Sequence, residues 1–417
     1  MHHTYPRWQA PLIKKALSTR RVLVLEGPRQ CGKTTLVKAL SGPHAIYRTL
    51  DDQTLLNAAI SDPQGFVRHG NELMIIDEIQ RAPSLLQAIK KDVDENQQPG
   101  RFLLTGSAHI QSLTGATESL AGRVRKMRLR PLSIGELYEK EPDFLQRAFR
   151  GEFVPHVLRA PREQFLYDKD AYLSLAFKGG YPEVLHLESE KERILWHEDY
   201  LNALIERDLK EITHIRRKDS MKKLIEVLAA WSSKFMDIAS LCKSLSIARP
   251  TIESYINALE ALYLVERVRP WHKTDYDRIG KQEKLFMTDT GMMASVLRWR
   301  LDQVRLDGDL NGKLMETFVF NQLSSILDTQ ENTYTLYHYR DREKREVDFL
   351  IERDDGPILG IEVKAGSVVT NDMFKHLKWF RNNIAPDQKF IGIVAYTGEQ
   401  VVSFGESLWA VPISCLF

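Results

Sequence analysis

The sequence predicts an α/β protein made of several domains, and three patterns along the chain lead to this prediction. In the first third, short apolar strands alternate with helical segments, as is typical of a parallel sheet wrapped by helices. Residues 237–271 contain two helices joined by a turn and followed by a pair of strands. Residues 345–367 contain two strands joined by a tight turn. Because 417 residues are too many for one ordinary domain, we expect about two to four domains.

The composition is that of a soluble globular protein, with 43% hydrophobic and 27% charged residues. The formal net charge is only +2, so any nucleic-acid surface has to be a local patch. The cysteines Cys31, Cys242 and Cys415 lie far apart, which argues against a disulfide framework. No apolar run is long enough to span a membrane, and the first fifteen residues lack the apolar centre of a signal peptide. We therefore expect a cytoplasmic protein without a membrane segment.

A glycine-rich loop between an apolar strand and a helix is the strongest motif in the chain. The sequence GPRQCGKT matches the phosphate-binding pattern G-x-x-x-x-G-K-[ST], in which backbone N–H groups converge on a β-phosphate at a helix N-terminus. Lys33 is expected to reach the β- and γ-phosphates, and Thr34 to hold Mg²⁺. The motif predicts ATP and Mg²⁺ as cofactors. The residues expected to bind the nucleotide are Gly27, Pro28, Arg29, Gln30, Cys31, Gly32, Lys33, Thr34 and Thr35.

A second buried strand, residues 73–76, ends in the two carboxylates of Asp77 and Glu78. Carboxylates are costly in a core but are well placed at the carboxyl edge of a parallel sheet. Asp77 is expected to organise the Mg²⁺ shell, and Glu78 to orient or deprotonate the attacking water. Together with the glycine-rich loop, this strand predicts ATP hydrolysis.

Two more strands, residues 45–52 and 101–108, complete the expected sheet. A strand between the two ATP motifs, with an acid beside Asp77, is the arrangement of AAA-type and related ATPases. Thr105 or Ser107 lies where such enzymes place a polar sensor of the γ-phosphate. The alternative is a turn of small residues.

Two arginines are candidates for an arginine finger that reaches the nucleotide of a neighbouring subunit. Arg123 follows the sensor-like strand, and Arg207 lies on a later helix. Either one could equally be an ion-pair partner on a solvated face. An arginine finger supplied to a neighbour would require a homo-oligomer, which we expect for this protein.

Short motifs follow one another along nearly the whole chain. They read LEGPRQCGKTTL, LMIIDEIQ, FLLTGSA, SLAGRV, RPLSIGEL, GGYPEVL, YLNALIERDLKEI and FMTDTGMMASVL. In this order they resemble a widespread family of prokaryotic AAA-type ATP-binding proteins, which end in a domain of unassigned function with a restriction-endonuclease-like core. The resemblance implies an AAA-type P-loop core in residues 1–140. Residues 141–215 are helix-rich, as expected for the helical lid that follows such a core.

Residues 216–271 are expected to form a winged helix-turn-helix. Pro250 fits the first turn of the second helix, and Ile252, Ile256 and Leu259 give that helix one buried face. The outward positions are expected to be Thr251, Glu253, Ser254, Asn257 and Glu260. Two glutamates would repel DNA phosphates, and only Arg249 would help. We therefore expect this module to contact protein rather than to read a DNA groove.

Basic residues cluster in residues 123–130 and 215–223. Lys126, Arg128 and Arg130 are expected to share one face of a strand, while Met127 and Leu129 point inward. Such runs are usually solvated surface, and a nucleic-acid path is the alternative.

Residues 272–417 resemble the PD-(D/E)XK nuclease fold. The resemblance implies that Asp348 and Glu362 hold Mg²⁺ and that Lys364 positions the attacking water. The family usually adds a glutamate from the preceding helix, and Glu316 lies at that place. Many domains of this fold bind without cutting, so cleavage stays open.

Two functions fit these patterns. The first is an ATP-driven motor or remodeller that acts on nucleic acid, with DNA as its partner, through the nuclease-like domain. The second is an ATP-dependent molecular switch in regulation or defence, whose partner is a protein and whose nuclease-like domain is a scaffold that does not cut. A simple transcription regulator is disfavoured by the two glutamates on the helix that would enter the groove.

Overall fold

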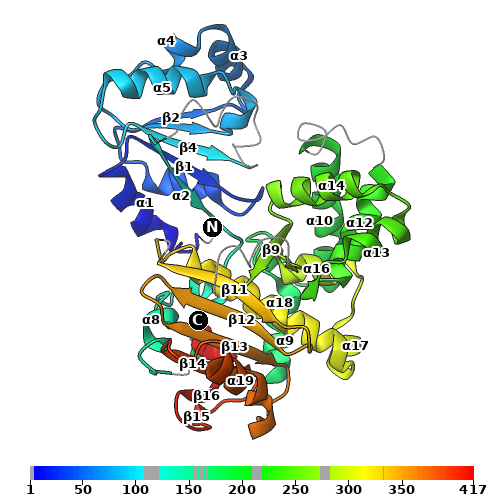
Figure 1. Ribbon diagram of the computed structural model, residues 1–417. Helices are drawn as coiled ribbons and strands as arrows, with labels where there is room; N and C mark the ends of the chain where they lie inside the picture. The colour runs from blue at the N-terminus through cyan, green and yellow to red at the C-terminus, as the bar shows by residue number, and fades with distance from the viewer. Residues whose placement is uncertain are drawn as a thin grey trace.

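The computed structural model describes residues 4–107, 122–153, 158–159, 164–165, 168–208, 218–272, 282–331 and 333–417. Within these ranges the strands form one sheet of five, one of nine and one of two. The five-stranded sheet lies at the upper end of the molecule, the nine-stranded sheet extends through its lower part, and a group of helices lies beside them (Figure 1). None of the described helices is both long and apolar enough to cross a membrane.

The N-terminal sheet has the order β2-β3-β4-β1-β5, and all its neighbouring strands are parallel. Its strands are β1 (Val22–Glu26), β2 (Ile46–Thr49), β3 (Met74–Asp77), β4 (Phe102–Gly106) and β5 (Val124–Arg128). The predicted parallel sheet is confirmed, and β4 lies between the strands that carry the two ATP motifs. Because the carboxyl ends of parallel strands meet at one edge, the loop after β1 and the acids at the end of β3 lie together.

Helices cover both faces of this sheet, because successive strand side chains point to opposite sides. One face packs against α3 (Gln53–Ser61), α4 (Pro63–Val67) and α5 (Leu85–Glu95). The other face packs against α1 (Gln9–Leu17) and α2 (Lys33–Leu40). The result is a three-layer domain with the glycine-rich loop and the acids that follow β3 at its carboxyl edge.

The middle of the chain is mostly helical. Its elements are α7 (Ile134–Leu137), α8 (Phe144–Ala148), β6 (Leu158–Arg159), β7 (Gln164–Phe165), α9 (Lys169–Lys178), η3 (Val184–His186), α10 (Glu190–Ala203), the π-helix η4 (Leu204–Asp208), α12 (Lys218–Ala230), β8 (Lys234–Phe235), α13 (Ile238–Leu245), α14 (Arg249–Ala261), β9 (Val265–Pro270), β10 (Lys284–Met287), α16 (Thr290–Val296) and α17 (Leu301–Leu306). Helices α8 and α9 share one hydrophobic core with the C-terminal sheet. We call the nine-stranded sheet and the helices packed on it the C-terminal body. The segment that was expected to form a helical lid on the AAA core therefore contributes α8 and α9 to the C-terminal body.

The nine-stranded sheet has the order β15-β16-β14-β13-β12-β11-β9-β10-β8. The C-terminal elements are α18 (Gly308–Leu327), β11 (Tyr334–Arg340), β12 (Glu346–Arg353), β13 (Ile358–Lys364), η5 (Asn371–Phe374), α19 (Lys375–Asn383), β14 (Phe390–Tyr396), β15 (Val402–Ser403), β16 (Leu408–Pro412) and η6 (Ile413–Leu416). Helix α18 packs on one face and α19 on the other. Strand β9 pairs in parallel with β11, so the middle and the C-terminal segments share one sheet.

A glycine pair in the motif GGYPEVL joins three segments of this body. The amide of Gly180 donates to Oδ2 of Asp289 at 2.7 Å, and its carbonyl oxygen accepts from the amide of Leu132 at 2.7 Å. A Cβ atom on Gly180 would lie 2.3 Å from the carbonyl oxygen of Leu132. The close approach of two backbones therefore requires glycine at this position.

We predict that Gly180→Ala destabilises the protein by about 3 kcal/mol, because the added methyl overpacks a backbone contact. Gly312→Ala is the control, since Gly312 lies inside α18 with open space around its Cβ position. Alanine there is expected to be neutral or to stabilise by up to about 1 kcal/mol. Urea unfolding of both variants checks this, and equal stability of the two would contradict the packing described.

Candidate nucleotide site and its neighbours

The glycine-rich loop lies between β1 and α2, at the carboxyl edge of the N-terminal sheet. Gly32 has φ of 98°, a left-handed conformation that favours glycine. At Gly27 a Cβ atom would lie 2.1 Å from the carbonyl oxygen of Leu129, so the backbone just after β5 leaves room only for glycine. The glycine-rich loop therefore leads directly into the first turn of α2, whose free backbone N–H groups favour an anion.

Lys33 is buried at the first position of α2, with 5% of its surface exposed. Its Nζ atom donates to the carbonyl oxygens of Gly27 at 2.9 Å and Pro28 at 2.7 Å. The ammonium group therefore lies against the loop. Phosphate oxygens would offer it charged acceptors, which form stronger hydrogen bonds than carbonyls.

The two residues predicted to organise Mg²⁺ lie in contact. Thr34 Oγ1 donates to Oδ2 of Asp77 at 2.8 Å, and the hydroxyl of Tyr47 donates to the same oxygen at 2.7 Å. Thr105, one of the two predicted sensor positions, donates to Oδ1 of Asp77 and accepts from the amide of Glu78 at 3.2 Å. Burial, followed by the nearby Asp77 carboxylate, raises the pKa of Tyr47, which keeps it a donor. Tyr47 lies on β2, which comes between the two ATP motifs along the chain, and its role was not predicted from the sequence.

Glu78 follows β3 and has φ of 60°, a left-handed conformation that is uncommon for residues other than glycine. Its carboxylate accepts a hydrogen bond from Nε2 of Gln80 and one from Oγ of Ser107 at 3.4 Å. Gln80 also donates to Oγ of Ser107 at 2.9 Å. The predicted catalytic acid and Ser107 thus belong to one polar group at the open edge of the sheet. Gln80 was not predicted from the sequence.

The structure places Arg123 away from this edge. Arg123 precedes the first residue of β5, and β5 runs parallel to β1, so Arg123 lies at the amino edge of the sheet. Its Nη2 atom bonds Oδ2 of Asp94 at 3.1 Å, and this hydrogen bond lowers the pKa of Asp94. Within one chain Arg123 is an ion-pair partner, the alternative role considered for it. The side chain of Arg207 lies outside the described residues.

A cavity of about 990 Å³ opens beside the glycine-rich loop. Gly32 and Thr35 form one wall, and the N-terminal segment and η3 form others. The rings of Tyr5 and His186 stack there with centroids 6.1 Å apart. Further lining residues include Pro6, Leu36, Leu132 and Pro182. An aromatic and apolar cavity next to a phosphate loop suits a nucleoside base.

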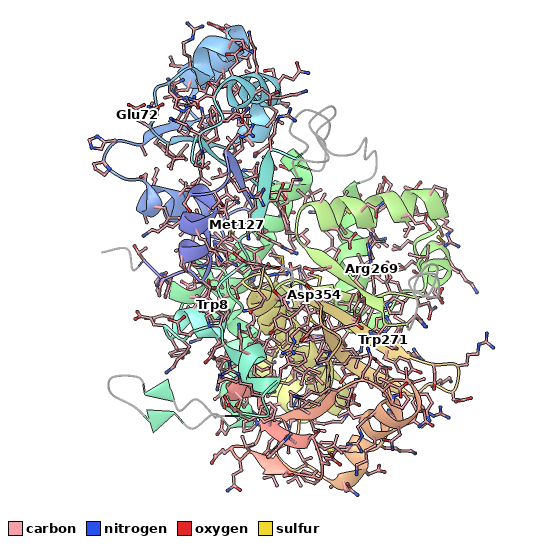
Figure 2. All side chains as sticks on the ribbon, turned by 60° about the vertical axis from the view of Figure 1, so that its left-hand side comes forward. Trp8, Glu72, Met127, Arg269, Trp271 and Asp354 are labelled. Carbon is pink, nitrogen blue, oxygen red and sulfur yellow. The ribbon has the colours of Figure 1, made fainter. Side chains whose placement is uncertain are left out.

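Arg7 fixes the N-terminal segment to the loop. Its guanidinium donates to the carbonyl oxygens of Cys31 at 2.8 Å and Arg130 at 2.6 Å, and to Oε1 of Glu136 at 3.0 Å. Glu136 also closes a capping box with Ser133 at the start of α7. The motif RPLSIGEL therefore supports the nucleotide site through Arg7. Figure 2 shows Trp8, the next residue, between the N-terminal sheet and the lower body.

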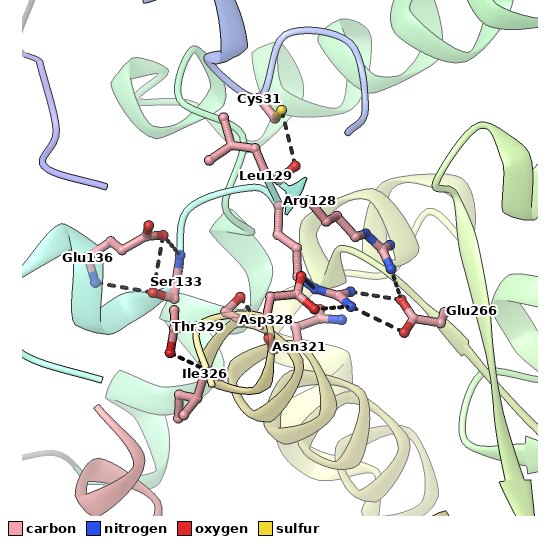
Figure 3. Close-up of polar contacts among 12 residues, drawn as sticks. Cys31, Arg128, Leu129, Ser133, Glu136, Glu266, Asn321, Ile326, Asp328 and Thr329 are labelled. Carbon is pink, nitrogen blue, oxygen red and sulfur yellow. Dashed lines mark hydrogen bonds and ion pairs between the residues drawn. The ribbon is translucent and has the colours of Figure 1, made fainter. Parts of the chain in front are cut away.

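Ion pairs made by Arg128, the last residue of β5, and by Arg130 connect the N-terminal sheet with the rest of the chain. Arg128 and Arg130 bond Glu266 of β9 at 2.7 and 2.8 Å, and Arg130 bonds Asp328 at 2.7 Å (Figure 3). Although burial acts to raise it, the two guanidinium groups hold the pKa of Glu266 well below its usual range. We call these four residues the arginine joint. Two of the three basic residues predicted to share a strand face are thus engaged inside the protein, which does not support a nucleic-acid path there.

The four residues of the predicted nuclease-like site come together in the C-terminal body. Glu316 extends from α18, Asp348 from β12, and Glu362 and Lys364 from β13. Lys364 Nζ lies 3.2 Å from Oε1 of Glu362. The amide of Val363 donates to Oδ2 of Asp348 at 2.8 Å. The resemblance therefore identified the right neighbours.

The ammonium of Lys284 lies among these acids, which sequence analysis did not predict. It lies 2.5 Å from Oε1 of Glu316, 2.7 Å from Oε1 of Glu346 and 3.4 Å from Oδ1 of Asp348. Across the described ranges, no group of three or more His, Cys, Asp or Glu residues is arranged to hold a metal ion. The geometry does not fit the Mg²⁺ site expected at Asp348 and Glu362, because each of these carboxylates is already paired with an ammonium group, Asp348 with Lys284 and Glu362 with Lys364.

The nucleotide site generates a prediction that separates binding from chemistry. Lys33→Ala should abolish ATP binding, because the loop loses the cation that reaches the phosphates. Glu78→Gln should bind ATP normally and lose hydrolysis by about 100-fold or more, since an amide cannot accept the proton of the attacking water. Titration with a fluorescent ATP analogue and a phosphate-release assay check both. Hydrolysis at the wild-type rate by either variant would contradict the site described.

Comparison with known proteins assigns the front of the chain and leaves the rest without a function. Residues 19–138 match the model of an AAA domain family. Residues 169–303 and 311–416 match two domains of unknown function, DUF8612 and DUF4143. The AAA match covers the glycine-rich loop, the acids after β3 and the strand that carries Thr105.

Relatives and solved structures are distant. The uncharacterized protein Rv2008c of Mycobacterium tuberculosis is 28% identical over 407 residues, 97% of this chain and 82% of its own length. MJ1544 of Methanocaldococcus jannaschii is 24% identical over 358 residues, 81% of this chain and 74% of its own. DnaA from Aquifex aeolicus is a structural neighbour with a TM-score of 0.30 and 13% identity, covering 60% of this chain and 86% of its own. The RuvB branch migration motor of Thermotoga maritima has a TM-score of 0.28 and 16% identity, covering 63% and 90%. The match to the family model, and not these distant structures, identifies residues 19–138 as an AAA-family ATPase-like domain.

Proposed function

We propose that this protein is an ATP-hydrolysing molecular switch, in which the nucleotide state of the AAA domain is passed to the C-terminal body through the arginine joint. One observation carries the proposal. Leu129, between the two arginines of the joint, has its carbonyl oxygen against Gly27 and 3.4 Å from Sγ of Cys31 in the glycine-rich loop. A single residue thus separates the loop from the ion pairs with Glu266 and Asp328.

The chemistry at the nucleotide end follows from the side chains at the open edge. Thr34 and Asp77 would hold Mg²⁺, which neutralises charge on the phosphates when bound. Glu78 would accept a proton from water as the water attacks the γ-phosphorus and the bond to the β,γ-bridging oxygen breaks. Ser107 and Gln80 keep the Glu78 carboxylate in place through their hydrogen bonds. Lys33 and Thr105 are positioned to respond to the γ-phosphate and its loss.

The middle module supports a switch that contacts protein. The elements α12, β8, α13, α14, β9 and β10 follow the order of a winged helix, which we infer for this region. On the outer face of α14, Glu253 pairs with Arg249 at 2.8 Å. Glu260 pairs with Arg267 of β9. Arg249 and Arg267 are therefore engaged with acids of α14, which weakens the attraction of this helix for DNA phosphates.

A nucleic-acid partner is the second candidate, favoured by helix α19. The helix carries Lys375, His376, Lys378 and Arg381 and contains no acidic residue. Its outer side is at least partly exposed. This helix packs on the C-terminal sheet, so DNA binding there would act through the C-terminal body. If Arg123 supplies an arginine finger to a neighbour in the predicted homo-oligomer, it has to exchange Asp94 for the nucleotide of that neighbour.

The switch predicts that a non-hydrolysable ATP analogue changes amide hydrogen exchange in β9 and in the last turns of α18. Glu266 of the arginine joint belongs to β9, and Asp328 directly follows α18. Arg130→Met should abolish this response while nucleotide still binds. Arg125→Met is the matched control, because Arg125 lies on β5, just before the joint, and pairs with the exposed Glu331 at 3.4 Å. Exchange mass spectrometry of the three proteins, with and without the analogue, checks this.

Two outcomes would count against the switch. An unchanged exchange pattern in β9 and α18 of the wild type would show that the joint does not transmit nucleotide state. Strong stimulation of ATP hydrolysis by single-stranded, duplex or branched DNA would favour the second candidate, since the switch predicts a rate that is indifferent to DNA.

A further inference from the structure

The buried lysine of the C-terminal body has three acidic partners that come from three different elements. Lys284 begins β10 and has 1% of its side chain exposed. Glu316 belongs to α18, while Glu346 and Asp348 lie two residues apart on β12 and so share one face of that strand. The ammonium of Lys284 donates hydrogen bonds to Glu346 at 2.7 Å and to Asp348 at 3.4 Å, and it forms an ion pair with Glu316 at 2.5 Å. Its positive charge is therefore surrounded by three acidic side chains.

The two residues expected to bind metal have their carboxylate oxygens engaged in the same way. Asp348 accepts from Lys284 through Oδ1 and from the amide of Val363 through Oδ2. Glu362 lies 3.2 Å from the ammonium of Lys364 through Oε1, and accepts from the amide of Asp348 at 3.4 Å through Oε2. Each of these four oxygens already has a partner from the protein itself.

We propose that Lys284 takes the place of a divalent cation in this acidic cluster, so that the cluster is complete without metal and becomes a metal site only when the ammonium is removed. The positions of the oxygens support the second part. Glu316, Glu346 and Asp348 each lie within 3.4 Å of the Lys284 ammonium, so its removal would leave three carboxylates beside the space it occupied. Carboxylate oxygens are the hard ligands that Mg²⁺ and Mn²⁺ prefer.

Electrostatic repulsion prevents a divalent cation and the Lys284 ammonium from occupying the acidic cluster together. A divalent ion bound to these oxygens would lie within a few ångströms of a buried ammonium group, and the repulsion between them is strong where water is excluded. Lys284 is part of the same chain as the acids, so its ammonium group is always present at the cluster, whereas a metal ion has to bind from solution.

This inference goes beyond the proposed function and does not depend on ATP hydrolysis. It assigns the C-terminal body a site with the layout of a metal-dependent nuclease and an internal cation. Any nucleic acid that contacts this body would be bound and not cleaved by metal-assisted hydrolysis.

The test measures Mn²⁺ binding by electron paramagnetic resonance on the full chain without nucleotide. Four proteins are compared: wild type, Asp348→Asn, Lys284→Ala, and the double variant Lys284→Ala with Asp348→Asn. Because all four keep the same P-loop, any difference between them reports the acidic cluster. Circular dichroism shows which variants are folded.

The expected result is equal binding by wild type and Asp348→Asn, with at least tenfold tighter binding of one Mn²⁺ ion by Lys284→Ala that the double variant lacks. Stronger binding by wild type than by Asp348→Asn would overturn the proposal. A folded Lys284→Ala protein that binds no more Mn²⁺ than wild type would also overturn it. Should Lys284→Ala not fold, the comparison of wild type with Asp348→Asn still decides whether the native cluster takes metal.

Discussion

The buried ion pairs of the arginine joint are the constraint on which the arrangement of this molecule depends. They connect the last strand of the AAA sheet to the long sheet and to the end of α18. Taking these charges out of water is costly, and only close, multiple hydrogen bonds offset that cost. Removing one partner leaves the others buried without compensation, at about 3–5 kcal/mol. Such a joint favours a few discrete arrangements over a continuous range, which is what a switch needs.

The position of the joint gives it a functional meaning. Leu129 contacts the phosphate loop, and Arg7 connects the same loop to the carbonyl of Arg130 and to Glu136. A phosphate that draws Lys33 away from the loop carbonyls would therefore alter the surroundings of the joint directly. The path from nucleotide to C-terminal body is short and made of named contacts.

Much of the nucleotide site could be predicted from the sequence, because its motifs are local. The glycine-rich loop, the acids after β3 and the parallel sheet depend on residues adjacent in the chain, and the structure and the AAA family model agree with them. The grouping of Glu316, Asp348, Glu362 and Lys364 was expected from the resemblance to the PD-(D/E)XK fold, and the structure brings these four residues into one region. Arg7, Tyr47 and Gln80 were missed, since nothing local distinguishes a polar side chain that closes a site from one that is solvated.

Lys284 was missed for a stronger physical reason. Its partners lie 32 to 64 residues further along the chain, and only the packing of β10 beside the C-terminal sheet brings them together. The same holds for the basic strand near Arg128 and Arg130. Alternation correctly predicted one shared face, but the acids that cover it come from β9 and the end of α18, far away in sequence. Charge runs alone do not reveal whether a face meets solvent or another part of the chain.

The central claim is that the arginine joint and the nucleotide site are coupled, and thermodynamic linkage makes this measurable from the nucleotide side. The most direct measurement is the ATP affinity of wild type, Arg130→Met and Arg125→Met by calorimetric titration. Coupling predicts that Arg130→Met changes the affinity by about fivefold or more, in the range of typical coupling energies, while Arg125→Met matches the wild type. Equal affinities for all three proteins would contradict the account.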